Sequence, residues 1–276
     1  MPTPYPPDRH LLRDLRLSFE QGDERTRRAW LPVVPELCTS DRAMRAGALA
    51  TLVDVIGGGL AAAVAHPGWI ATADLTLHLV SAATQGSVEA RARVAHAGRT
   101  TVVIEVELHD DADANIGLAT MSFAVLPRRD DNPDITAAPA SGVSTMALAT
   151  SGLRASLLDE LELRVIDAGR GVLEAPVGEW SLNSLGAMQG GAVATVTDAA
   201  AETAARAATG EDLVVTDLQL TYLALARVGP IRTRVDVLGA APDAVTARVE
   251  LVDTGAGSRV TSIGRVVATS SLRGVR

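Results

Sequence analysis

Two aspartates in otherwise apolar stretches are the first candidates for chemistry. Asp54 and Asp198 each follow a run of Ala, Gly, Val and Thr residues that is typical of a buried helix. An unpaired carboxylate is costly to bury, so each aspartate must have either a polar partner or a catalytic role. The catalytic role would be that of a general base on water, or of a nucleophile. The alternative is a structural carboxylate satisfied by a buried Arg or Thr.

The two aspartates occupy equivalent positions of an internal repeat. Three pairs of segments match: 47–54 with 191–198, 74–77 with 217–220, and 106–108 with 249–251. Positions in the first pair differ by 144 and in the other two by 143. A shared offset across three segments is hard to produce by chance, so the chain consists of two copies of one unit.

Each copy predicts the same order of elements: two short strands, one long helix and four more strands. The helices are expected over 43–65 and 190–207. The four strands are expected over 70–80, 88–96, 101–109 and 117–126 in the first copy, and over 213–223, 231–238, 245–252 and 260–268 in the second. Neither helix has a polar face, because the sheet covers one side and the second copy covers the other. The expected domains are 1–127 and 151–276, joined by a linker over 128–150 that is rich in Asp, Pro, Ala and Ser.

Composition excludes several classes of protein. The net charge of −8 and the lack of a basic stripe argue against a nucleic-acid partner. Cys38 is the single cysteine, so neither an internal disulfide nor a cysteine-based zinc site can form. The apolar window 46–65 contains Asp54 and three glycines, which favours a buried core helix over a membrane span. The N-terminus lacks a signal-peptide pattern, so we expect a cytoplasmic protein.

A motif around the second helix carries a family resemblance. Asn183 is followed six residues later by Gln189-Gly190-Gly191, and Asp198 stands nine positions after Gln189. This pattern resembles the hotdog-fold acyl-CoA thioesterases of the phenylacetyl-CoA thioesterase (PaaI) type, in which a His stands where this chain has Gln. Thr72-Ala73-Asp74-Leu75 in the first copy, and Asp217-Leu218 followed by Tyr222 and Arg227 in the second, are similar to the family's next strand.

The resemblance implies an α+β double hotdog, with an antiparallel sheet wrapped around two long central helices, one in each half. Its site would lie across the interface of the two units. Gly190 and Gly191, without a Cβ, would let a thioester carbonyl reach the N–H groups of the helix N-terminus as an oxyanion hole. The alternative is that these glycines only allow helix entry or tight packing.

Further site residues follow from the resemblance. The candidate catalytic residues are Asp54, Asn183, Gly191, Thr72 and Asp198, and the candidate substrate-binding residues are Gln189, Gly190 and Arg227. Arg227 would meet a phosphate of CoA. For Asn183 the alternative is an ordinary cap or turn residue, for Thr72 an ordinary strand residue, and for Arg227 a solvated strand end.

The two composite positions are not equal. One combines Asn183, Gly190 and Gly191 with Asp54 and Thr72, so every role is filled. The other combines Thr39, Ala46 and Gly47 with Asp198 and Val215, with Arg45 where the family's His would be. We expect the first position to be catalytic and the second to be degenerate.

The expected function is hydrolysis of acyl-CoA thioesters by acid/base chemistry, without a metal or a cofactor, CoA being part of the substrate. The five histidines show no metal-ligand spacing, and none lies at a helix start. The two halves would form an intramolecular pseudo-dimer, with a further homo-oligomer left open. The alternatives are a catalytically silent acyl-CoA-binding or regulatory protein on the same fold, and an isomerase or hydratase acting on the acyl chain.

Overall fold

The two halves of the chain show the same order of long elements, one helix followed by four strands. In the computed structural model, residues 5–128 and 142–270 are described. The first half contains α1 (Leu11–Asp14), β1 (Ser18–Gln21), β2 (Thr26–Pro32), a 3₁₀ turn (Pro35–Leu37), α2 (Ala46–Ala65), β3 (Trp69–Leu79), β4 (Ser87–Ala97), β5 (Thr101–His109) and β6 (Asn115–Leu126). The second half contains α3 (Leu157–Glu160), β8 (Arg164–Asp167), a 3₁₀ turn (Ala168–Arg170), β9 (Val172–Ala175), a 3₁₀ turn (Glu179–Ser181), α4 (Gly190–Thr209), β10 (Val214–Tyr222), β11 (Ile231–Ala241), β12 (Ala244–Asp253) and β13 (Arg259–Thr269). The two long helices and the eight long strands agree with the predicted elements to within about three residues.

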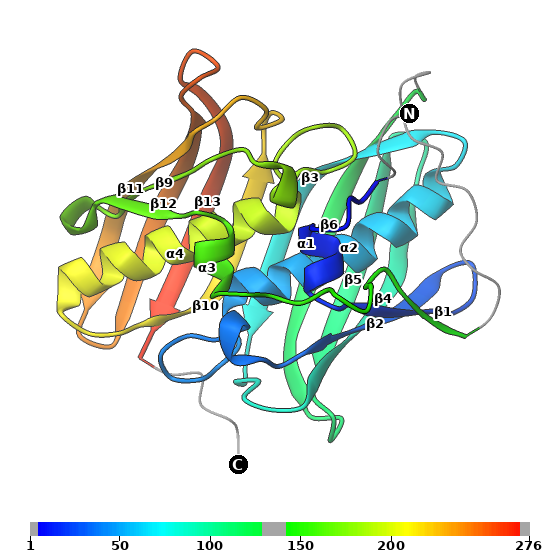
Figure 1. The fold of residues 1–276 in the computed structure, drawn as a ribbon, viewed down its shortest axis with the longest axis horizontal. Coiled ribbons are helices and arrows are strands. Elements are labelled where there is room, and N and C mark those ends of the chain that lie inside the picture. Colours follow the sequence, from blue (N-terminus) through cyan, green and yellow to red (C-terminus); the bar gives the residue numbers. More distant parts are fainter. Residues whose placement is uncertain (1–4, 129–141, 271–276) are drawn as a thin grey trace.

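All strands of the described residues belong to one sheet, and both long helices lie on the same face of it (Figure 1). The strand order is β7-β1-β2-β4-β5-β6-β3-β10-β13-β12-β11-β9-β8. The halves join where β3 and β10 pair antiparallel, from Asp74 opposite Thr221 to His78 opposite Asp217. Each half therefore supplies one half-sheet and one helix to a continuous core.

Glycine allows the two long helices to touch. A Cβ at Gly47 would lie 2.5 Å from the Cα of Thr195, and a Cβ at Gly191 would lie 2.5 Å from the Cα of Thr51. Such a close approach of two backbones requires residues without a side chain. The two contacts of this helix crossing are equivalent, because Gly47 and Thr51 of α2 correspond in the repeat to Gly191 and Thr195 of α4.

Helix α2 is long and apolar enough to span a membrane by length and composition, but 67% of that window is buried inside the molecule. It packs on the sheet and on α4, as expected of a core helix. The predicted linker 128–150 lies partly outside the described residues. Within its described part, β7 (Val143–Thr145) pairs with β1.

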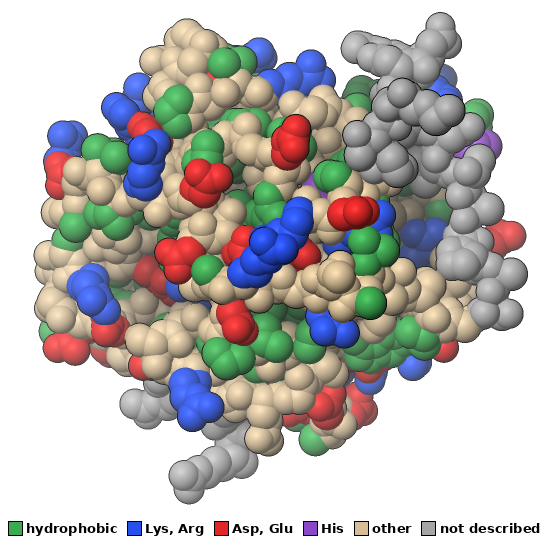
Figure 2. Space-filling model, in the orientation of Figure 1, with side chains coloured by type: hydrophobic (Ala, Val, Ile, Leu, Met, Phe, Trp, Pro, Cys, Tyr) green, Lys and Arg blue, Asp and Glu red, His purple; other side chains and the backbone are tan. Residues whose placement is uncertain are grey.

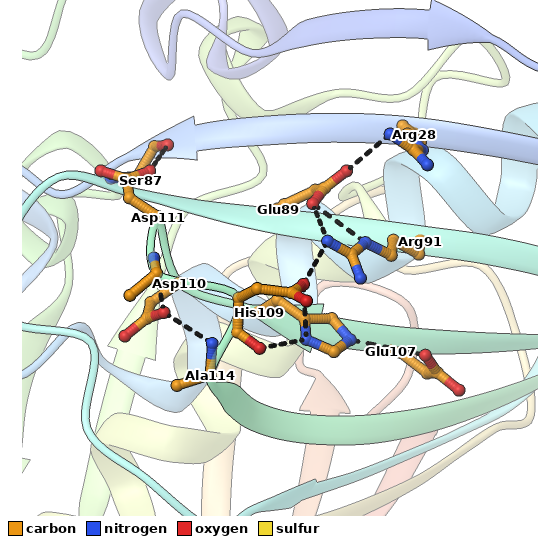
Figure 3. A network of polar contacts seen from close by, with 11 residues as sticks. Arg28, Ser87, Glu89, Arg91, Glu107, His109, Asp110, Asp111 and Ala114 are labelled. Atoms are coloured by element: carbon orange, nitrogen blue, oxygen red, sulfur yellow. Dashed lines mark hydrogen bonds and ion pairs between the residues drawn. The ribbon is translucent and has the colours of Figure 1, made fainter.

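The molecular surface carries charges of both signs. On the face that shows the helices, acidic and basic side chains are interspersed (Figure 2). The opposite face of the first half-sheet holds a polar network in which Arg91 binds Glu89 and Asp113, each at 2.6 Å (Figure 3). This network links β2 and β4 through Arg28 and Glu89 and contains none of the candidate site residues.

Candidate functional site

The carboxylate of Asp54, on α2, lies against the N-terminus of α4. The residue is 8% exposed. A Cβ at Gly190 would be 2.8 Å from both carboxylate oxygens, so glycine at this position leaves the space that the carboxylate occupies. Asp54 also contacts the Gly191 N–H and the Thr72 hydroxyl. The fold therefore brings Asp54, Thr72, Gly190 and Gly191 together from three elements.

Burial sets the protonation of Asp54. Desolvation raises the pKa of Asp54 to about 6, although the contacts with the Gly191 N–H and the Thr72 hydroxyl oppose the rise. A carboxylate of that pKa is ionised at neutral pH and is a far better base than an ordinary aspartate. This arrangement suits proton transfer from a bound water.

The side chain of Gln189 caps the N-terminus of α4. Gln189 is the N-cap residue, and its Oε1 accepts the Gly191 N–H at 3.0 Å. Gln189 is 6% exposed. The structure thus places Gln189 on the donor that the sequence assigns to the oxyanion hole, so a substrate carbonyl must replace this bond to use the Gly191 N–H.

Asn183 lies in the loop that leads into α4. Its Oδ1 accepts the backbone N–H groups of Leu185, at 2.9 Å, and Ala187, at 3.1 Å. The oxygen of the amide is therefore engaged in shaping the loop, as the turn alternative expects. The NH₂ group is the part of Asn183 that remains for a substrate or a water.

Thr72 lies at an irregularity of β3. The pairing of β3 with β6 shifts register between Thr72 and Asp74, so the strand is bulged next to Asp54. Bulges commonly redirect a side chain at a site. Here the Thr72 hydroxyl contacts the Asp54 carboxylate.

Arg227 is exposed on the loop that follows β10. Buried Asp253 fixes this loop by accepting the N–H groups of Arg227 and Val228, both at 3.0 Å, and that of Gly229 at 2.8 Å. The neighbouring Ala226 carbonyl accepts the Met188 N–H at 2.8 Å. The Arg227 loop therefore lies beside the N-terminus of α4. The sequence motif gave no sign of the role of Asp253 in fixing this loop.

The charge of Asp54 acts on both tyrosines of the chain. The Tyr222 hydroxyl donates to the Gly190 carbonyl at 3.0 Å. The charge of Asp54 adds to the effect of burial in raising the pKa of Tyr222 well above its ordinary value and the pKa of Tyr5 to about 12. Tyr222 was part of the sequence motif, whereas Tyr5 stands in a proline-rich segment without any periodic pattern and was missed.

The equivalent position in the other half is closed by an ion pair. Asp198 Oδ2 accepts Arg45 Nη1 at 2.9 Å and the Gly47 N–H at 3.1 Å, and the Asp198 side chain is fully buried. Arg45 Nη1 also reaches Glu202 Oε2 at 3.2 Å. Burial raises the pKa of Asp198, and the Arg45 charge opposes this rise. The alternative to a catalytic aspartate was a structural one satisfied by a buried arginine. At Asp198 this alternative holds, because Arg45 is that arginine.

The Asp198 position differs from the Asp54 position at three further residues, as the alignment of the two halves predicts. Ala46 takes the place of Gly190 at the N-terminus of α2, Val215 that of Thr72, and Thr39 that of Asn183. The second position therefore has the methyl group of Ala46 where the first has Gly190, and the apolar side chain of Val215 where the first has the Thr72 hydroxyl. Among residues 5–128 and 142–270, no group of three or more His, Cys, Asp or Glu side chains is placed to hold a metal ion.

Comparisons with known proteins agree with this fold. Residues 45–116 match the family model of the Thioesterase superfamily. No curated protein matches the chain. A proposed thioesterase from Novosphingobium aromaticivorans is similar in structure, with a TM-score of 0.64 at 18% identity over 92% of this chain and 98% of that one.

Two further solved structures are similar over most of the chain. A proposed thioesterase II from Thermobifida fusca has a TM-score of 0.60 at 16% identity, covering 92% of this chain and 95% of that one. An acyl-ACP thioesterase from Bacteroides thetaiotaomicron has a TM-score of 0.60 at 12% identity, covering 88% and 97%. Together with the match over residues 45–116, these likenesses show that the chain has the hotdog fold of thioesterases, with an antiparallel sheet on a long helix.

Proposed function

We propose that the chain is a double hotdog of the phenylacetyl-CoA thioesterase type that hydrolyses acyl-CoA thioesters at the site between Asp54 and the N-terminus of α4. The units would be residues 1–127 and 151–276, joined by residues 128–150, and they act as an intramolecular pseudo-dimer. The observation that carries the proposal is the buried Asp54 carboxylate, with a pKa raised to about 6, lying over Gly190.

The proposed reaction begins with water between Asp54 and the thioester. The Asp54 carboxylate takes a proton as the water oxygen attacks the carbonyl carbon. The carbonyl oxygen becomes an oxyanion, which takes the Gly191 N–H from Gln189 Oε1 and from the newly protonated Asp54, and lies at the positive end of the α4 dipole. The C–S bond then breaks, and the leaving thiolate takes the proton from Asp54. The products are the free acid and CoA.

Other groups serve orientation. Thr72 fixes the Asp54 carboxylate, and the amide NH₂ of Asn183 faces the water or the thioester. The exposed guanidinium of Arg227 is suited to a phosphate of CoA, because a charge-assisted contact forms without burying the arginine. The proposed chemistry is confined to a small-molecule substrate in the cytoplasm, with no metal, cofactor or nucleic acid taking part.

The test is release of free thiol from a panel of acyl-CoA esters that differ in chain length and in aromatic character. Turnover of at least one ester above the rate without protein supports hydrolysis. Tight binding of the panel without release would instead establish the catalytically silent acyl-CoA-binding protein and overturn the proposal.

A further inference from the structure

One buried aspartate holds the backbone of the loop that carries Arg227. Asp253, the last residue of β12, is 1% exposed. Its Oδ2 accepts the N–H groups of Arg227 and Val228, and its Oδ1 accepts those of Gly229 and Ala256, the last at 3.2 Å. Bonds to an ionised carboxylate are stronger than bonds between neutral groups. Three successive residues of the loop are therefore fixed by one side chain.

The same loop is attached at both of its ends. At one end, Thr254 donates its N–H, at 3.1 Å, and its hydroxyl, at 2.8 Å, to the Pro230 carbonyl. At the other end, the Ala226 carbonyl accepts the Met188 N–H at 2.8 Å, one residue before the N-cap of α4. The loop therefore connects the turn after β12 with the N-terminus of α4, where the proposed oxyanion hole lies.

The first half has a loop of similar shape in the matching place. Ala83, the repeat equivalent of Ala226, accepts the Met44 N–H at 2.8 Å beside the N-terminus of α2. Gly86 and Gly229 also correspond, and both have left-handed backbone, with φ of 72° and 71°. Differences between the two loops are therefore differences of side chain and attachment at a common backbone shape.

The central attachment is missing from the first-half loop. Asp110 is the repeat equivalent of Asp253, but in the described part of the chain it accepts N–H groups of its own turn (Figure 3). Asp111 holds only the last residue of the loop, through the Ser87 hydroxyl at 2.6 Å and the Ser87 N–H at 3.1 Å (Figure 3). The aspartate that fixes the middle of the loop thus occurs in the second half alone.

The basic residue follows the same division. Arg227 stands in the loop beside the Asp54 position, where the catalytic roles are filled, and Thr84 is its equivalent beside the Asp198 position. Within residues 5–128 and 142–270, the exposed Arg227 guanidinium has no ion-pair or hydrogen-bond partner, so it is available to an anion. A loop that is already ordered loses little conformational entropy when its arginine binds that anion.

We propose that Asp253 is a positioning residue that gives the Asp54 position its preference for a thiol carrier with phosphate groups. By fixing the loop backbone, Asp253 holds Arg227 beside the N-terminus of α4, where the guanidinium meets a phosphate of the carrier. The proposal rests on the proposed thioester hydrolysis for its kinetic consequence. It assigns the selectivity for the carrier to a residue that touches neither the carrier nor the reacting carbonyl.

The experiment compares one acyl group carried by CoA and by pantetheine, which lacks the phosphates. Its readout is the ratio of kcat/KM for the two thioesters. Arg227→Gln should lower this ratio about two- to fivefold, as expected of an exposed ion pair. Asp253→Asn should lower it by a similar factor, because Asn lacks one of the two acceptor oxygens. The double variant should fall no further than Arg227→Gln, since both changes remove the same contact.

Asp110→Asn is the matched control, because it makes the same substitution at the equivalent position without loosening the Arg227 loop. It should leave the ratio unchanged. An equal fall of kcat/KM for both thioesters in Asp253→Asn would show that Asp253 only supports the fold. Additive losses in the double variant would show that Asp253 does not act through Arg227. Either result would overturn the proposal.

Gly229→Ala carries the test if Asp253→Asn does not fold. It disturbs the same loop without removing the carboxylate, because a φ of 71° is strained for alanine. The ratio should fall again in Gly229→Ala and stay unchanged in Gly86→Ala, at the equivalent position. An unchanged ratio in Gly229→Ala would contradict the proposal.

Calorimetric titration with CoA and with pantetheine separates this proposal from the proposed function. A chain that releases no thiol from any ester refutes hydrolysis. Weaker binding of CoA, but not of pantetheine, in Asp253→Asn would still establish the positioning role. A parent chain that binds CoA no more tightly than pantetheine would refute the role of Asp253, whether or not the chain hydrolyses thioesters.

Discussion

The carboxylate of Asp54 and the Cα of Gly190 belong to different halves of the chain, yet they are so close that a Cβ at position 190 would lie 2.8 Å from both carboxylate oxygens. Neither half contains the site alone. The crossing of α2 and α4 creates it, and the helix dipole and the base arrive from opposite units.

Replacement of Gly190 by Ala tests this contact. The new methyl group would push the Asp54 carboxylate out of place by several tenths of an ångström or more, and such misplacement can cost about 100-fold in rate. We expect kcat/KM for the best acyl-CoA ester to fall by about that factor with the fold retained. Gly239→Ala is the matched control, because a Cβ there meets nothing within 4 Å. Equal rates for the two variants would refute the contact.

The pH–rate profile should report the Asp54 base. Its pKa is raised to about 6, and only the ionised carboxylate accepts a proton from water. We expect kcat/KM to be constant above about pH 7 and to fall toward tenfold per pH unit well below 6. A profile that is flat from pH 5 to 8 would exclude Asp54 as the base.

Asp54 should be destabilising at neutral pH. Its pKa is raised from 3.8 to about 6 by burial, so the folded state binds the proton more tightly than the unfolded state. The stabilisation by that proton is complete below pH 3.8 and is lost as pH rises through 6. Asp54→Asn should therefore raise the free energy of unfolding at pH 8 by up to about 3 kcal/mol, and by little at pH 4. Urea unfolding at the two pH values measures this, and an Asn variant less stable than the parent at pH 8 would contradict it.

Arg45 should matter for stability. Its removal in Arg45→Met leaves Asp198 and Glu202 buried without their cation, which typically costs about 3 to 5 kcal/mol. Burial and the Asp198 charge raise the pKa of Glu202 to about 8, and burial raises the pKa of Asp198, so the loss should shrink as the pH falls from 9 to 5 and the two carboxyl groups take up protons. Arg93→Met is the control, since exposed pairs such as Arg93–Glu105 contribute less than about 1 kcal/mol. Equal unfolding midpoints for the two variants would show that the Arg45 cluster is dispensable.

Sequence was sufficient for the two long helices and the eight long strands, because their signal is local periodicity. The same pattern did not reveal α1 and α3, each of which is a single turn, nor β7, which has three residues. It predicted that Asp54 and the glycine pair would meet, because the family motif places them there. Tyr5 was not predictable, since its contact with Leu182 depends on how the two halves dock, and no local pattern records that.

The roles of the two aspartates can be separated by one measurement. Free-thiol release from the best acyl-CoA ester is compared for the parent chain, Asp54→Asn and Asp198→Asn. A lost general base typically costs about 10² to 10⁴ in rate, so Asp54→Asn should nearly abolish turnover. Asp198 is paired with Arg45, so Asp198→Asn should retain most of the activity once folding is confirmed by circular dichroism. Equal losses in the two variants, or a greater loss in Asp198→Asn, would contradict catalysis at the Asp54 position.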